Sequence, residues 1–192
     1  MALTESAGSI VDTILNWLAG VDPTTLGLLT AGFTALETTA LIGLVVPGDL
    51  VVLLAGSTAA TPQRIMLILL AAALGTYVGE LCGYGLGRLA GPRLRYSRLG
   101  RMLGERRWQR AESYLAGRGA PVLVPARFVS VVHAVAPVVA GTVRMPVRKF
   151  AFWSAVGAVV WATTYTAVGA AAGSAYRTYG HLGLALSVGL MA

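Results

Sequence analysis

The sequence predicts an all-α integral membrane protein. We expect an inverted repeat of two opposed re-entrant helical hairpins, each followed by a transmembrane helix, plus an N-terminal amphipathic helix and a C-terminal helix. Of the 192 residues, 56% are apolar and 12% are charged, and the mean hydropathy is +0.70, whereas about a quarter of the residues in a soluble domain are charged. Several apolar stretches approach the roughly 20 residues that a spanning helix needs. Two of these stretches are interrupted by proline and by charge, which indicates hairpins, because broken backbone at membrane depth must be buried in protein or line a wet cavity.

Residues 1–22 are predicted to form an amphipathic helix that lies at the membrane interface. Their apolar side chains follow the i, i+4, i+7, i+8 spacing of one helix face, at Ile10, Ile14, Trp17 and Leu18. We expect no cleavable signal peptide here, because acidic residues stand where such a peptide would carry Lys or Arg.

Residues 24–61 form the first predicted re-entrant hairpin. The segment is too long for one span and is broken at Pro47-Gly48, so we place the hairpin tip at Pro47 and Gly48. It carries two carboxylates, Glu37 and Asp49. Few basic residues flank the segment, which favours entry from the outer face of the membrane.

Residues 65–87 are predicted to span the membrane, with Glu80 inside an otherwise apolar stretch. The next segment, residues 88–118, is the most basic part of the chain. It has arginine at positions 88, 93, 95, 98, 101, 106, 107, 110 and 118. By the positive-inside rule this segment is cytoplasmic.

Residues 121–143 form the second predicted hairpin, and we place its tip at Pro137. The segment also holds Pro125, Arg127 and His133, so an uninterrupted helix facing lipid is not expected. Basic residues lie on both sides of it. By the same rule both flanks are cytoplasmic, and the segment enters and leaves the membrane by one face.

A span over residues 150–173 follows, and residues 179–192 form a C-terminal transmembrane helix or part of one. Matched spacings between the two halves support an inverted repeat. Glu37 precedes Pro47 by ten residues, as Arg127 precedes Pro137. Glycines at positions 75, 87 and 91 have the same spacings as glycines at positions 157, 169 and 173.

Each acidic residue in these apolar segments has two interpretations, because a charge near the bilayer centre costs about 2.5 to 3.5 kcal/mol. Glu37 is either a hydrogen-bonded structural carboxylate or a group that exchanges protons with a wet cavity. Asp49 either caps the second limb of its hairpin or titrates at the site, and the two roles are compatible. Glu80 is expected to face the bundle interior, as a structural support or as part of a proton relay.

Arg127 has no acidic neighbour in its own segment. Its expected partners are Glu37 or Asp49, or an anionic ligand that the guanidinium binds bidentately. The alternative is a purely structural ion pair. His133 is either a pH-sensitive second ligand or a satisfied core histidine.

These residues resemble a known family, and the motifs that carry the resemblance are spread along most of the chain. In order they are Glu37, Pro47-Gly48-Asp49, Gly79-Glu80, Gly83-Tyr84, Gly87-Arg88, Arg127-Phe128, Ala136-Pro137, Ala140-Gly141, Phe150, Gly157-Ala158 and Trp161. The set is similar to that of the DedA family, whose domain is also called SNARE-associated Golgi or VTT. The similarity runs from about Leu26 to Gly173.

The resemblance implies opposed re-entrant hairpins and a flippase-like role in moving lipids across the bacterial cytoplasmic membrane. Family members are associated with undecaprenyl phosphate recycling or phospholipid flipping, with proton or sodium coupling, and with envelope integrity. The essential acidic pair of the family falls on Glu37 and Asp49, and its first hairpin arginine on Arg127. The second arginine falls on His133, and a proline of the pattern falls on Ser130, so this hairpin departs from the family.

We therefore expect a transporter of an anionic, phosphate-bearing lipid, coupled to protons or Na⁺. The alternatives are a proton or small-ion antiporter with indirect effects on envelope lipids, and a non-transporting membrane scaffold. An enzyme is not expected, because no Ser/His/Asp arrangement or metal-ligand cluster is recognisable, and no cofactor is implied. Nucleic acid is not an expected partner despite the net charge of +7, because no aromatic platform is interleaved with the basic residues. The lipid, the direction of transport and the oligomeric state, a homo-oligomer included, stay open.

Overall fold

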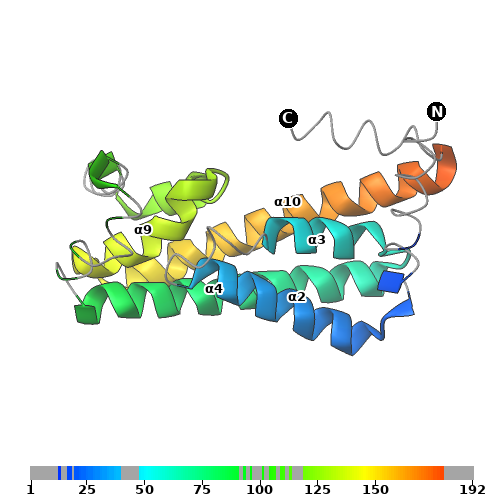
Figure 1. Cartoon of the computed structure of the whole chain (residues 1–192), viewed down its shortest axis with the longest axis horizontal. Helices are drawn as coiled ribbons and strands as arrows, with labels where there is room; N and C mark the ends of the chain where they lie inside the picture. The colour runs from blue at the N-terminus through cyan, green and yellow to red at the C-terminus, as the bar shows by residue number, and fades with distance from the viewer. Residues whose placement is uncertain are drawn as a thin grey trace.

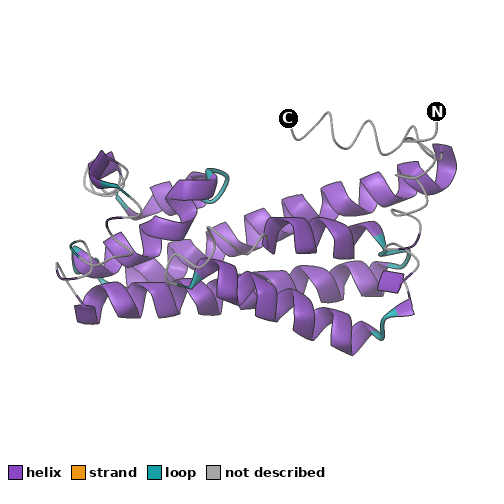
Figure 2. Ribbon diagram, in the orientation of Figure 1, coloured by secondary structure: helices purple, strands orange, loops and turns teal. Residues whose placement is uncertain are grey.

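The computed structural model describes residues 20–39, 48–90 and 119–179, together with isolated positions between 13 and 18 and between 93 and 113. In these ranges every regular element is a helix (Figure 2), which agrees with the predicted all-helical class. The proposed tip residue Pro47, most of the predicted N-terminal helix and nearly all of the predicted C-terminal helix lie outside the described residues.

Two long helices run the length of the described structure, α4 (Pro62–Ala90) and α10 (Val147–Tyr179). Both are long and apolar enough to cross a membrane, and they contain the predicted spans 65–87 and 150–173. Figure 1 shows that they run in opposite directions. The start of α4 has a proline in its first turn, and the preceding Thr61 hydroxyl accepts a hydrogen bond from the Arg64 backbone N–H at 3.3 Å, as is typical of a helix N-terminus.

Two shorter helices, α2 (Pro23–Thr38) and α3 (Gly48–Ser57), occupy one end of the molecule (Figure 1). Asp22 caps α2, because its carboxylate accepts hydrogen bonds from the Thr25 N–H at 2.9 Å and from the Thr25 hydroxyl at 3.0 Å. These bonds lower the pKa of the exposed Asp22 carboxyl. Helix α2 ends at Thr38, where the backbone of Thr39 becomes extended.

The other end of the molecule holds η2 (Ala120–Val122), α8 (Leu123–Ala126) and α9 (Ser130–Thr142). The chain turns between α8 and α9, over residues 127–129, and Val129 is in extended conformation. Pro137, which we had placed at the tip, instead lies inside α9. The helix continues through it because residues 133–141 are buried against neighbouring helices, and such packing stabilises a helix that contains proline.

The two ends are packed in a matching way. Helix α3 packs on α10, and helix α9 packs on α4. Helix α2 also packs on α4, and helix α8 on α10. Glycines allow these close approaches, since a Cβ atom at each would overlap with the backbone or a side chain of the neighbouring helix. They are Gly75 and Gly79 (facing α2), Gly87 and Gly141 (between α4 and α9), and Gly56, Gly169 and Gly173 (between α3 and α10).

The fold has an apolar surface, and its interior combines apolar clusters with buried polar side chains. One face of α2 buries Thr30, Thr34 and Thr38, and each hydroxyl donates to a carbonyl four residues earlier at 2.8 or 2.9 Å. Large apolar side chains such as Leu74 and Phe152 are instead 61% exposed. A surface of this kind is suited to lipid, because lipid tails satisfy apolar side chains and leave the polar ones to pair inside.

The glycine contacts predict a large difference between two substitutions in the same helix. Gly79→Ala places a Cβ against the backbone and Thr38 of α2, so we expect a loss of about 1 to 3 kcal/mol of stability from overpacking. Gly85→Ala faces open space and should be neutral, or stabilising by up to about 1 kcal/mol through helix propensity. Thermal unfolding of both purified variants in detergent checks this, and equal melting temperatures would contradict the packing described.

Candidate functional site

The five ionisable residues singled out in the sequence are brought together where the two ends of the molecule meet. We call Glu37, Asp49, Glu80, Arg127 and His133 the charge cluster. They come from α2, α3, α4, the turn after α8, and α9. Asp49 is half-buried, and the other four are at most 6% exposed. Arg127 interacts electrostatically with Glu37, Asp49 and His133.

Arg127 forms a buried ion pair with Glu80 of α4, in which Nη1 donates to one carboxylate oxygen of Glu80. The second guanidinium nitrogen, Nη2, donates to the Thr76 hydroxyl at 3.2 Å. The other oxygen of Glu80 accepts a hydrogen bond from the Ser154 hydroxyl of α10. The guanidinium also lies over the Trp161 ring, with Cζ 4.7 Å from the ring centroid, within the range of a cation–π contact.

The direct partner of Arg127 therefore differs from the prediction. We expected Glu37 or Asp49, whereas the ion pair is made to Glu80, which faces the interior as expected. Glu80 meets the turn after α8 because α9, which follows that turn, packs along α4. Sequence analysis also missed Thr76 and Ser154. A spacing signal was present, since Thr76 lies four residues before Glu80 and Ser154 seven residues before Trp161, which places each pair on one helix face.

The two other carboxylates lie beside each other at the inner ends of α2 and α3. The Glu37 carboxylate lies against Gly48, so closely that a Cβ at Gly48 would overlap with it. Gly48 thus leaves room for Glu37. Asp49 is in the first turn of α3, where the helix dipole favours a negative charge, and the Trp161 side chain lies near it. Asp49 is inside the helix and so is not its N-cap.

Two buried nitrogen atoms of the cluster have no hydrogen-bond partner among the described residues. They are Nε of Arg127 and Nδ1 of His133, on side chains that interact electrostatically. An unsatisfied buried polar atom costs about 1 to 3 kcal/mol, so such atoms mark a place where a polar ligand gains from binding. In the described ranges no three His, Cys, Asp or Glu side chains are placed to hold a metal ion.

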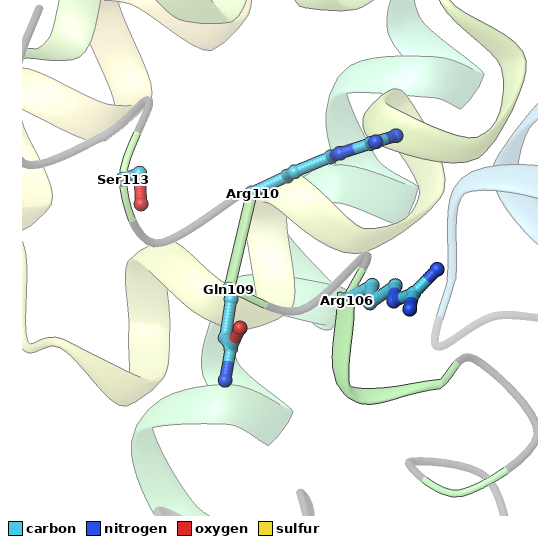
Figure 3. A pocket seen from close by; sticks show the side chains of 4 residues that line it. All are labelled: Arg106, Gln109, Arg110 and Ser113. Carbon is cyan, nitrogen blue, oxygen red and sulfur yellow. The ribbon is translucent and has the colours of Figure 1, made fainter.

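A basic pocket lies in the segment after α4, and none of the residues that line it belongs to the charge cluster. Arg106, Gln109, Arg110 and Ser113 line it (Figure 3), and all four are exposed. The side chains of Arg106 and Arg110 extend in the same direction (Figure 3). Guanidinium groups arranged in this way can interact with anionic headgroups at a membrane surface.

The arrangement defines a class of protein: a helical membrane protein in which half-length helices bring ionisable side chains together in the interior. The chain belongs to the VTT domain family, the DedA family, whose pattern matches residues 46–171. The match includes Asp49, Glu80, Arg127 and His133, and begins after Glu37. The sequence-level resemblance to this family is thereby confirmed.

Curated relatives extend the same conclusion. The chain is 29% identical over 130 residues to the protein DedA of Escherichia coli K12, an alignment that covers 64% of this chain and 58% of DedA, and DedA of E. coli O157:H7 matches equally. An uncharacterized membrane protein of Synechocystis is 33% identical over 122 residues, with 62% of this chain and 56% of the relative covered. The chain thus spans somewhat more than half the length of these relatives. No solved structure matches significantly.

The buried ion pair predicts strongly non-additive effects on stability. Arg127→Ala leaves the Glu80 carboxylate without its cation, at an expected cost of about 3 to 5 kcal/mol. The double variant Glu80→Gln/Arg127→Met removes the unpaired carboxylate at position 80 and should recover most of that loss. Thermal unfolding in detergent measures both, with the exposed Glu105→Gln as the control for loss of a carboxylate. Losses that simply add would show that the two side chains are not coupled.

Proposed function

We propose that this protein is a transporter that translocates a phosphate-bearing lipid across the cytoplasmic membrane, driven by a proton or sodium gradient. The substrate class is a polyprenyl phosphate such as undecaprenyl phosphate, or a phospholipid. One observation carries the proposal: a buried guanidinium, whose Nε has no partner in the described part of the chain, lies beside three carboxylates at the meeting point of the half-length helices. Membership of the DedA family supports it.

In this proposal the side chains of the cluster divide the work. Arg127 receives the lipid phosphate, because a guanidinium matches phosphate geometry, and Nδ1 of His133 assists it. Glu37 and Asp49 exchange protons or bind the coupling ion. The lipid tail stays in the bilayer, against the apolar side chains on the outside of the helices.

We further assign α2 with α3, and α8 with α9, as two re-entrant hairpins of an inverted repeat. The matching packing of α3 on α10 and of α9 on α4 supports this assignment. So does the correspondence of Gly87 and Gly169: a Cβ at Gly87 would overlap with the carbonyl of Val138 in α9, and one at Gly169 with the carbonyl of Leu53 in α3. The chain is then multi-pass, with residues 88–118 in the cytoplasm by the positive-inside rule.

The test is lipid translocation in proteoliposomes under an imposed proton or sodium gradient. Glu37→Gln and Arg127→Ala should each lower the rate of polyprenyl phosphate translocation to below about a tenth of wild type, because a buried charge at the site is lost. The exposed Glu105→Gln and Arg148→Ala serve as matched controls and should retain the wild-type rate. Full activity of either cluster variant, in a folded protein, would refute the mechanism.

The histidine at the position of the second family arginine gives a pH prediction. Histidine can become charged beside a bound phosphate, whereas arginine is charged at every physiological pH. Translocation by the wild type should therefore vary more with pH than translocation by His133→Arg. Rates measured at two pH values, for a polyprenyl phosphate and for an ordinary phospholipid, check this and also rank the two lipids. Parallel pH profiles would remove His133 from the mechanism.

A second candidate is a proton or small-ion antiporter whose effects on lipids are indirect. The excess of three carboxylates over one guanidinium in the cluster favours it, because such an interior attracts cations. An antiporter predicts gradient-driven ion flux in liposomes without any polyprenyl phosphate. In a non-transporting scaffold, by contrast, exchange of the charges of the ion pair, by Glu80→Arg with Arg127→Glu, would preserve function, which a phosphate-binding site does not tolerate.

A further inference from the structure

The contacts that hold Arg127 occupy the nitrogen atoms that a lipid phosphate needs. Nη1 donates to Glu80 and Nη2 to Thr76, while Nε has no partner among the described residues. A guanidinium binds phosphate through two parallel N–H groups. One free nitrogen is not enough for that geometry, so phosphate binding requires that Arg127 give up at least one of its present contacts.

Glu80 is held in the position from which it competes with a phosphate for Arg127. Its second oxygen accepts the hydrogen bond of Ser154 on α10, and Ser154 is itself 2% exposed. Glu80 is 5% exposed, so water does not screen its attraction for Arg127 as it would at a surface. Glu37 and Asp49 also act on Arg127 electrostatically, but only Glu80 is in direct ionic contact with it among the described residues.

We propose that Glu80 is an internal counter-ion that an incoming phosphate headgroup must displace from Arg127. Glu80 thereby lowers the affinity of the site for phosphate and shortens the time for which the headgroup stays bound. A transport site needs this property, because binding must be favourable enough for entry and weak enough for release. The inference rests on the proposed function, since it takes Arg127 as the ligand of the headgroup.

The test is equilibrium binding to the full-length chain in detergent, with farnesyl phosphate, inorganic phosphate and farnesol as probes. Glu80→Gln should bind farnesyl phosphate at least about tenfold more tightly than wild type, because a competing charge-assisted hydrogen bond is lost. Inorganic phosphate should gain similarly, and farnesol should not change. Tighter binding of farnesyl phosphate than of inorganic phosphate identifies the lipid as the source of the phosphate.

Two matched controls separate the direct contact from a general change of charge. Glu37→Gln removes a carboxylate from the same cluster without touching the ion pair, and Glu105→Gln removes an exposed one. Glu105→Gln should stay within about threefold of wild type, as expected of a charge in solvent. Glu37→Gln should gain less than Glu80→Gln, because Glu37 acts on Arg127 without direct ionic contact. An equal gain in Glu37→Gln, or a gain for farnesol, would overturn the inference.

The remaining outcomes distinguish this inference from the proposed function. If Arg127→Ala binds farnesyl phosphate as wild type does, the proposed function is wrong and the role of Glu80 falls with it. If Arg127→Ala loses binding but Glu80→Gln shows no gain, only the role of Glu80 is refuted. Should Glu80→Gln prove unstable, rescue of its melting temperature by farnesyl phosphate supports the inference. Failure of that rescue, while Glu80→Gln/Arg127→Met is folded, overturns it.

Discussion

The buried ion pair between Arg127 and Glu80 is the interaction on which the described structure depends most. It connects the turn after α8 to the middle of α4, and the Ser154 hydroxyl brings α10 into the same contact. A guanidinium inside a membrane protein is tolerated only with a counter-ion and further hydrogen bonds. Arg127 has both, together with the Trp161 ring, so one side chain links the second half of the chain to the first, in addition to the packing of α9 on α4 and of α3 on α10.

The glycine-rich interfaces are the second constraint, because they let the helices come close enough for short polar contacts to form. Gly75 and Gly79 allow the threonine face of α2 to pack closely against α4. The Thr38 hydroxyl therefore donates to the carbonyl of Thr76 at 3.2 Å. Thr76 in turn accepts from Arg127. The buried polar network therefore depends on the close backbone packing. Both matter for stability, because lipid provides no hydrophobic force to hold helices together.

Much of the architecture could be predicted from the sequence because the bilayer restricts what an apolar chain can form. The lengths of the apolar stretches around α4 and α10, and the rarity of charge within them, were enough to predict helices and to single out the five residues of the cluster. Which charges pair could not be predicted, because Arg127 and Glu80 are 47 residues apart and their pairing depends on how α9 lies on α4.

Pro137 illustrates the other limit of sequence reasoning. A proline indicates a break only where the surroundings do not hold the helix, and α9 is held through its buried length. The turn forms at residues 127–129, which contain neither proline nor glycine. Thr76 and Ser154 escaped notice because single hydroxyl side chains are common in membrane helices and acquire meaning only from the neighbours that packing supplies.

The two short helices α3 and α9 both begin at the charge cluster, so their backbones contribute to the electrostatic potential there. Each helix N-terminus carries a partial positive charge of roughly half an elementary charge from its aligned peptide dipoles. Asp49 lies in the first turn of α3, and His133 lies near the start of α9. The backbone therefore adds a fixed positive potential to the cluster, one that does not titrate and that survives every side-chain substitution that leaves the two helices in place.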